Sequence, residues 1–156
     1  MLNSDFKEFA ELLNAHGVEV LVVGGYALAA HGHPRYTGDI DFWVSPSRAN
    51  ITRLLTALQA FGFGSLGLKA EDFSDDTVVQ LGQPPRRVDL LTRIDGVDFS
   101  SCWSRREILD IDGVRMAFIG LEDFKTNKRA SGRLKDLADL EALGAAPPPP
   151  TRKEPP

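Results

Sequence analysis

At 156 residues the chain has the length of one domain, and its 42% hydrophobic and 26% charged residues are typical of a globular protein. The net charge of −4 argues against bulk electrostatic binding of nucleic acid, and no run reaches the roughly 20 apolar residues of a membrane span. The N-terminus lacks the pattern of a signal peptide, and a single cysteine, Cys102, excludes an internal disulfide. We therefore expect a cytoplasmic protein that does not associate with membranes.

The first 44 residues alternate between helical and strand patterns. The glycine pair Gly24-Gly25 ends the first strand pattern. Helical spacing of apolar residues, β-branched runs and a loop containing glycine and proline follow one another. These patterns predict, in chain order, an amphipathic helix over 4–17, a strand over 18–23, a short helix over 26–30, a loop over 31–38 and a strand over 39–44.

The rest of the chain continues the mixture of strands and helices. A helix capped by Ser45 or Ser47 precedes an irregular, glycine-rich segment. The remaining patterns predict strands over 77–81 and 87–92, a hairpin over 107–119 around Asp112-Gly113, and a C-terminal helix pair over 121–130 and 133–143. We therefore predict an α+β (mixed α/β) domain over residues 1–143, with a central mixed sheet flanked by helices. The proline-rich segment 144–156 should form a disordered tail.

Asp39 and Asp41 are the first candidate site residues. Side chains alternate across a strand, so two acids two residues apart project from the same face and favour a cation between them. Gly24-Gly25, between a strand and a helix, offers backbone N–H groups suited to phosphate. Acids for a metal beside amides for phosphate suggest a nucleoside triphosphate as ligand. Tyr26, directly after the glycines, is a candidate to stack on a nucleobase.

Asp89 lies in an apolar run, where a carboxylate is costly unless it is paired or bound to a cation. If its strand neighbours that of Asp39 and Asp41, three carboxylates share one site and favour a divalent metal. The alternative is that Asp89 lies at a strand end in solvent or pairs with Arg86 or Arg87.

The ordered set of motifs resembles the DNA polymerase β-like nucleotidyltransferase superfamily. The string GGYALAAHGHPRYTGDIDFWV is similar to that family's strand, Gly-Gly or Gly-Ser turn, short helix and Asp-x-Asp strand, and Asp89 completes the pattern. In the C-terminal part, Lys125-Thr126-Asn127-Lys128 and the segment from Gly132 to Leu140 are similar to segments of the abortive-infection nucleotidyltransferase toxins and their small stand-alone relatives.

The resemblance implies a nucleotidyltransferase fold and transfer of a nucleoside monophosphate from an NTP to a hydroxyl on RNA, protein or a small molecule. Asp39, Asp41 and Asp89 would bind two Mg²⁺ ions, with Mn²⁺ as an alternative, and Asp89 would be a candidate general base. Gly24 and Gly25 would hold phosphates. Arg35 or Thr37, together with Lys125 or Lys128, would neutralise the charge that develops on the transferred phosphorus. A role in a toxin–antitoxin system, with an antitoxin partner, also follows from the resemblance alone.

Arg133 and Asp136 are the other expected site residues, because Arg133 follows the break at Ser131-Gly132 and a cation at a helix start needs a partner. The basic residues of this segment could instead form a solvated face with local ion pairs. The chain departs from the family in having Gly25 where many members have serine, and in ending soon after Asp139. A non-catalytic nucleotide-binding or protein-interaction module is therefore the alternative function, and a phosphohydrolase is a third.

Overall fold

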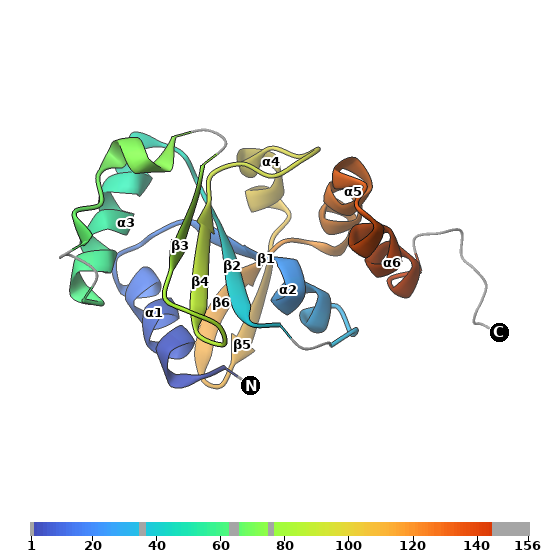
Figure 1. Cartoon of the computed structure of the whole chain (residues 1–156), viewed down its shortest axis with the longest axis horizontal. Coiled ribbons are helices and arrows are strands. Elements are labelled where there is room, and N and C mark those ends of the chain that lie inside the picture. The colour runs from blue at the N-terminus through green and yellow to red at the C-terminus, as the bar shows by residue number, and fades with distance from the viewer. Residues whose placement is uncertain (1, 35–36, 63–65, 75–76, 145–156) are drawn as a thin grey trace.

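A computed structural model of the chain describes residues 2–34, 37–62, 66–74 and 77–144. Its centre is a six-stranded mixed sheet with the order β3-β4-β2-β1-β6-β5 (Figure 1). The strands are β1 (Val20–Val23), β2 (Asp39–Val44), β3 (Val78–Leu81), β4 (Arg87–Leu91), β5 (Glu107–Ile111) and β6 (Val114–Phe118). Strand pairs β2–β4 and β1–β6 are parallel, and the other neighbours are antiparallel, so the predicted mixed sheet is confirmed.

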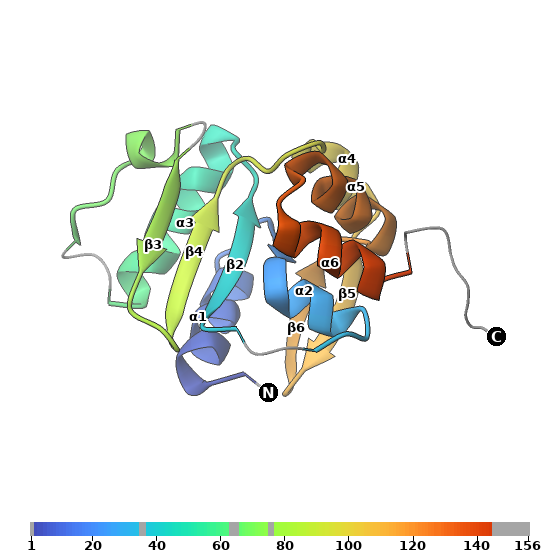
Figure 2. The same ribbon diagram turned by 45° about the vertical axis from the view of Figure 1, so that its right-hand side comes forward.

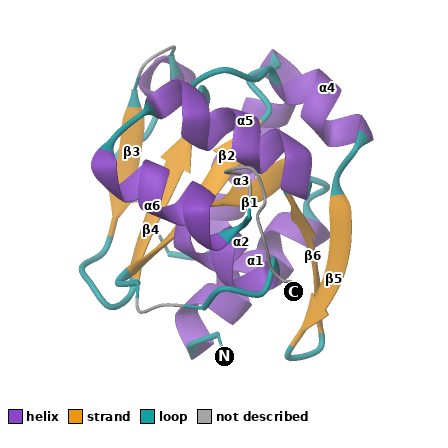
Figure 3. Ribbon diagram, turned by 90° about the vertical axis from the view of Figure 1, so that its right-hand side faces the viewer, coloured by secondary structure: helices purple, strands orange, loops and turns teal. Residues whose placement is uncertain are grey.

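Helices cover both faces of the sheet (Figures 2 and 3). One face carries α1 and α3, and Phe9 of α1 meets Phe42 of β2 edge to face at 5.7 Å between ring centroids. On the other face lie α2, α4, α5 and α6, and Phe99 of α4 packs on Trp43 at 5.2 Å. The helical bounds are α1 (Ser4–Ala15), α2 (Gly24–Ala30), α3 (Arg48–Ala60), the 3-10 turn η2 (Ala70–Phe73), α4 (Phe99–Ser104), α5 (Leu121–Ser131) and α6 (Leu134–Ala142).

Local sequence signals explain where most elements begin and end. Ser47 caps α3 by accepting a hydrogen bond from the Asn50 N–H at 3.2 Å, which decides between the two predicted caps. Gly132 ends α5 with φ at +63°, a left-handed conformation that suits glycine. The predicted Asp112-Gly113 turn has positive φ at both residues, as tight hairpins require. Helix α4 and η2 are the elements that the sequence analysis did not predict.

The two tryptophans and the cysteine contribute to the packing of the core. Trp43 is 1% exposed, and Cys102 is fully buried in α4. Trp103 is partly buried and stacks on Phe99 at 5.6 Å. No helix among the described residues is long and apolar enough to cross a membrane. The predicted tail lies outside the described residues, apart from Gly144.

The register places the candidate acids in one row. Val23 of β1 is opposite Asp41 of β2, Asp41 is opposite Asp89 of β4, and Asp89 is opposite Gln80 of β3. Residues that are opposite each other in neighbouring strands project from the same face. The row therefore runs from the start of α2, directly after Val23, to the edge of the sheet at β3.

Candidate active site

Three carboxylates converge on the face of the sheet that α5 and α6 cover. Asp39 and Asp41 lie two residues apart on β2, and Asp89 lies beside Asp41 on the parallel strand β4. One oxygen from each of Asp39, Asp41 and Asp89 lies within 4.8 Å of the others. The structure therefore brings together the three acids that the sequence analysis singled out.

The turn at Gly24 approaches the acids so closely that it has no room for a side chain. Gly24 has φ at +69°, and a Cβ there would lie 2.1 Å from Asp41 Oδ2. Gly25 is buried, and a Cβ on it would lie 3.0 Å from Thr37 Cβ. A side chain at this position would therefore crowd Thr37. Backbone N–H groups of this turn belong to the first turn of α2, where no intrahelical acceptor is available.

Arg87 connects two of the acids, and the sequence analysis named it only as an alternative partner of Asp89. Its Nε donates to Asp89 Oδ1 at 2.9 Å, and its second terminal nitrogen donates to Asp89 Oδ2 and to Asp39 Oδ2, both at 3.1 Å. Both expectations for Asp89 are thus met together, because it joins the acid cluster and also pairs with Arg87. The available signal was strand alternation, which places residues 87 and 89 on one face.

Thr37 orients the remaining acid from the loop before β2. Its hydroxyl donates to Asp39 Oδ1 at 2.9 Å and lies 3.1 Å from the Asp39 carbonyl oxygen. Thr37 thus belongs to the site, but the groups it contacts are Asp39 and the backbone. Arg35, the other residue expected in this loop, lies outside the described residues.

The three acids differ in how their surroundings shift their pKa values. Burial, followed by the charges of Asp39 and Asp89, raises the pKa of Asp41 to about 8. Burial also raises the pKa of Asp89, with Arg87 opposing the increase. Burial would raise the pKa of Asp39 as well, but hydrogen bonds from Thr37 and its other neighbours outweigh it and lower this pKa. Asp41 is therefore the acid of the three whose protonated form is most favoured, chiefly because it is buried.

This donor set fits a divalent metal ion. Carboxylate oxygens are the ligands that Mg²⁺, Mn²⁺ and Ca²⁺ prefer, and a cation among these acids would relieve the repulsion that raises the pKa of Asp41. Arg87 already supplies one positive charge to Asp39 and Asp89. Asp41 accepts no hydrogen bond from Arg87, so it is the acid with the greatest need for a metal.

A cavity of about 660 Å³ opens over the acids. Its volume falls in the range of small-molecule sites, which is ~300–1,000 Å³. The sheet side contributes the acids, Gly24, Gly25, Thr37, Val78, Gln80 and Leu91, and the opposite side contributes Arg93, Asp95, Asn127, Lys128, Ser131, Arg133 and Lys135. Arg93, Asp95, Asn127 and Gln80 were not expected, because they lack a motif and reach the cavity only through the fold.

Lys128 lies at the cavity wall, but its ammonium group is held by carboxylates. Its Nζ lies 3.0 Å from Asp136 Oδ1 and 3.0 Å from Asp139 Oδ2, and all three side chains are under one tenth exposed. Asp136 also accepts from Ser131 Oγ at 2.5 Å and from Arg133 Nε at 2.8 Å. Burial opposes ionisation of Asp136, but these donors together lower its pKa. The network joins α5 to α6 and leaves Arg133, 72% exposed at its side chain, as the more accessible cation.

The structure places two other expected residues away from the acids. Lys125 pairs with Glu122 at 3.4 Å and does not line the cavity. Tyr26 meets Phe6 edge to face at 5.8 Å and lines an apolar hollow between α2 and the β5–β6 hairpin. His31 Nε2 lies 2.9 Å from the Ile119 carbonyl oxygen, also away from the acids.

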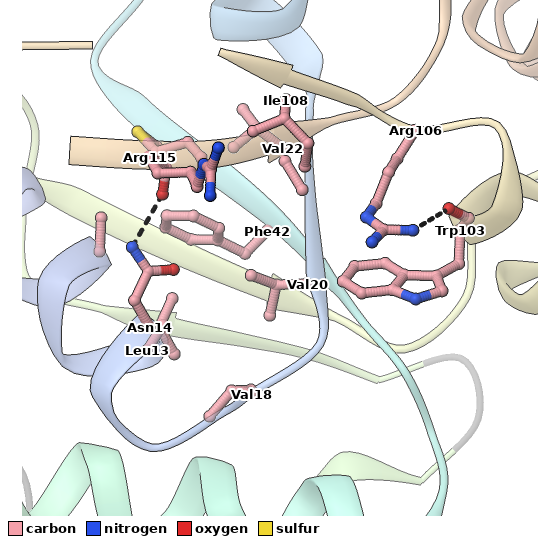
Figure 4. A pocket seen from close by; sticks show the side chains of 13 residues that line it. Leu13, Asn14, Val18, Val20, Val22, Phe42, Trp103, Arg106, Ile108 and Arg115 are labelled. Atoms are coloured by element: carbon pink, nitrogen blue, oxygen red, sulfur yellow. Dashed lines mark hydrogen bonds between the residues drawn. The ribbon is translucent and has the colours of Figure 1, made fainter. Parts of the chain in front are cut away.

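A different hollow lies on the opposite face of the sheet (Figure 4). Its floor is apolar, with Leu13, Val22 and Phe42, and Arg106 lies over the Trp103 ring at 4.0 Å. At about 160 Å³ it is smaller than the ~300 Å³ lower limit of typical ligand sites, and none of the described carboxylates lines it. The acid cavity is thus the better candidate for chemistry.

Comparison with known proteins agrees with this geometry. A family model described as a nucleotidyltransferase of unknown function (DUF6036) matches residues 2–145. The chain belongs to this family. Membership supports the wider nucleotidyltransferase superfamily that the motifs resemble, and a general nucleotidyltransferase role. A search of curated proteins finds no match.

Two solved structures have a fold similar to that of this chain. A Thermotoga maritima protein assigned as a nucleotidyltransferase is 16% identical, with a TM-score of 0.56 over 90% of this chain and 88% of its own. An antigenic nucleotidyltransferase-like protein from Paracoccidioides brasiliensis is 19% identical, with a TM-score of 0.52 over 91% of this chain and 75% of its own. At these identities the likeness is one of fold, and it confirms the predicted nucleotidyltransferase-like architecture.

Proposed function

We propose that the protein is a Mg²⁺-dependent nucleotidyltransferase that transfers a nucleoside monophosphate from an NTP to a hydroxyl group. The observation that carries this proposal is the convergence of Asp39, Asp41 and Asp89 within 4.8 Å, beside a glycine turn that has no room for a Cβ. The cavity of about 660 Å³ is large enough for a nucleotide. Family membership supports the same reaction class.

In this reaction the acceptor oxygen forms a bond to the α-phosphorus, and the bond between that phosphorus and the α–β bridging oxygen breaks. Pyrophosphate leaves with the bonding electrons, and the hydroxyl proton passes to Asp89 or to solvent. Asp39, Asp41 and Asp89 would hold Mg²⁺, which supplies charge neutralisation and a more acidic hydroxyl when bound. Backbone N–H groups of Gly24 and Gly25 would hold the β and γ phosphates, and Thr37 would keep Asp39 oriented.

The cavity wall formed by α5 and α6 suits the rest of the nucleotide. Arg133 is one cation that could reach it, because its side chain is mostly exposed and lines the cavity. Lys128 and Asp136 would act by positioning Arg133 and joining the helices. We assign no phosphate contact to Lys125, because it pairs with Glu122 outside the cavity.

The test is pyrophosphate release and label transfer with the full chain. Wild-type protein, Mg²⁺ and α-labelled NTPs are incubated with a cell extract, in parallel with Asp41→Asn and the matched surface variant Asp110→Asn. We expect labelled acceptor and pyrophosphate from wild type and Asp110→Asn, and neither from Asp41→Asn. Equal labelling by Asp41→Asn would refute catalysis at this site.

A second function, nucleotide binding without turnover, is favoured by one observation. The Arg87 guanidinium already bridges Asp39 and Asp89, where a second metal ion would need the same oxygens. A protein of this kind would bind an NTP tightly and release no pyrophosphate with any acceptor. Calorimetric NTP binding combined with a sensitive pyrophosphate assay separates the two functions.

We also propose that, within the superfamily, the protein is related to the stand-alone abortive-infection toxins and acts in a toxin–antitoxin pair. The support is the similarity of residues 125–140 to segments of those toxins. Within these residues, Lys128 pairs with Asp136 and Asp139. The expected result is growth arrest on expression of wild type and none with Asp41→Asn. Normal growth with both proteins at equal expression would argue against a toxin role.

A further inference from the structure

Arg87 places a positive charge of the chain itself inside the acid cluster. Its Nε and its second terminal nitrogen donate to the two oxygens of Asp89 at 2.9 and 3.1 Å, and the same terminal nitrogen donates to Asp39 Oδ2 at 3.1 Å. A guanidinium that meets a carboxylate at two points in this way is held strongly and in a fixed orientation. Both oxygens of Asp89 and one oxygen of Asp39 therefore already have a cation beside them.

The contacts of Arg87 and Thr37 leave Asp41 as the acid that is open to a metal ion. Asp39 Oδ1 accepts from the Thr37 hydroxyl at 2.9 Å, so both oxygens of Asp39 have donors. Neither Arg87 nor Thr37 donates to Asp41. Asp41 Oδ2 also lies against the Gly24 turn, since a Cβ on Gly24 would be 2.1 Å from it. A metal ion bound to Asp41 would thus lie beside the backbone that we propose for the phosphates.

Arg87 is held apart from the space that a nucleotide would enter. It lies on β4 opposite Asp39 of β2, and its side chain is 29% exposed. All three acids line the cavity, whereas Arg87 does not. The side chain of Asp89 is 8% exposed, so little room remains around the oxygens that Arg87 holds. A nucleotide could therefore fill the cavity and reach the acids without displacing Arg87.

The formal charges of the cluster favour one divalent ion. Three carboxylates and one guanidinium leave two negative charges, which one divalent ion balances. A second ion would leave two positive charges in excess beside the guanidinium, and like charges a few ångströms apart repel each other.

The opposite side of the cavity supplies further positive charge for a triphosphate. Among the described residues its charged side chains are the exposed Arg93, Arg133 and Lys135, the acid Asp95, and Lys128, which is paired with Asp136 and Asp139. Cations thus outnumber acids on this side, so neutralisation of the triphosphate does not depend on a second metal ion.

On the basis of the transferase function proposed above, we propose that the site holds one divalent ion, bound chiefly by Asp41 and Asp39. Arg87 takes the place of the second ion that the superfamily resemblance implies. Arg87 is then a positioning residue, because it holds Asp39 and Asp89 and supplies a positive charge that does not dissociate. Removal of its guanidinium should open the position for a second ion.

The test counts the metal ions bound by the full chain without turnover. The protein is loaded with Mn²⁺ and an NTP analogue whose α–β bridge is a methylene group, which keeps the triphosphate but cannot release pyrophosphate. Native mass spectrometry counts the ions in each complex. Electron paramagnetic resonance distinguishes an isolated Mn²⁺ from a coupled pair ~3.5–4 Å apart, the spacing of two-metal sites. We expect wild type to bind one ion with the spectrum of an isolated Mn²⁺.

Variants of two adjacent arginines separate the role of Arg87 from a general loss of positive charge. Arg87→Gln should bind two coupled ions, whereas Arg87→Lys, which keeps the charge, should bind one. Arg86→Gln is the matched control, because Arg86 pairs with Asp5 at 3.0 Å and not with the acids of the cluster. It should bind one ion, as wild type does.

A coupled pair of ions in wild type, in Arg87→Lys or in Arg86→Gln would overturn the one-ion proposal and leave the transferase function intact. A single ion in folded Arg87→Gln would overturn it as well. The wild-type count decides the question even if Arg87→Gln fails to fold. A wild type that binds no metal ion, with or without the analogue, would instead refute the metal site and with it the transferase function.

Discussion

Replacement of Gly24 by alanine tests whether the glycine turn and Asp41 form one unit. Gly24 has φ at +69°, and an added Cβ would lie 2.1 Å from Asp41 Oδ2. The chain offers a matched control in Gly17, which has φ at +65° but whose added Cβ would meet nothing closer than Arg53 Cδ at 4.0 Å. The two variants therefore share the backbone strain and differ in the contact with the acid.

The expected magnitudes follow from these contacts. An alanine in the left-handed region costs about 1–2 kcal/mol, and this cost should appear in both variants. Real Cβ contacts do not fall below 3.0 Å, so Gly24→Ala must also move Asp41 by almost 1 Å. A misplacement of ~1 Å in an active site can lower the rate about 100-fold. We thus expect a similar or somewhat larger loss of stability for Gly24→Ala, and a loss of activity for this variant alone.

Urea unfolding gives the free energy of unfolding, and pyrophosphate release gives the activity of each folded variant. Gly17→Ala should retain activity close to wild type despite its strain. If Gly24→Ala were as active as Gly17→Ala, the close approach of the turn to Asp41 would have no catalytic role. If both variants kept wild-type stability, the assigned positive φ values would be contradicted.

Three further predictions concern the charges of the site. In the absence of divalent metal, stability should fall as the pH rises from about 4 to about 8, because the unfolded chain releases the Asp41 proton near its ordinary pKa whereas the folded chain retains it until about 8. The urea midpoint should therefore depend less on pH for Asp41→Asn than for wild type. Equal pH dependence in the two proteins would contradict the raised pKa. Arg87→Gln should bind Mg²⁺ about tenfold more tightly by calorimetry, because it removes the positive charge that competes for Asp39 and Asp89; weaker binding would instead show that Arg87 orients the acids for the metal. Lys128→Met should lower the free energy of unfolding in urea by about 3–5 kcal/mol, since it leaves buried carboxylates unpaired. Lys125→Met should lower it by under about 1 kcal/mol, because the partner of Lys125 is mostly exposed. Similar losses for the two variants would argue against the buried network.

The two lysines of the Lys-x-x-Lys segment show why the motif did not assign roles. Lys125 and Lys128 are equivalent in the pattern, and one or the other was expected to neutralise charge on the transferred phosphorus. In the fold, Lys125 pairs with Glu122, and Lys128 is enclosed by Asp136 and Asp139. Helix α6 packs against α5 and supplies both of these acids. The pairing depends on that packing, which spacing along one helix does not contain.

Arg87 shows a similar limit on the sheet. Strand alternation places Arg87 and Asp89 on one face, so a pair between them was available as an alternative. The contact of Arg87 with Asp39 depends on the register between β2 and β4. Residues 39 and 87 are 48 positions apart, and no local pattern specifies their alignment.

The amino-acid sequence by itself determined the local parts of this site. Period-two alternation placed Asp39 and Asp41 on one face, the glycine pair marked the turn before α2, and apolar periodicity located most helices and strands. The tertiary structure decided that β4 lies parallel to β2, so that Asp89 meets Asp41, that Arg87 bridges two acids, and that β3 is left at the edge beside the cavity. The reason is that periodicity reflects only which side of an element is buried, whereas strand order and register follow from how helices from distant segments pack over the whole sheet.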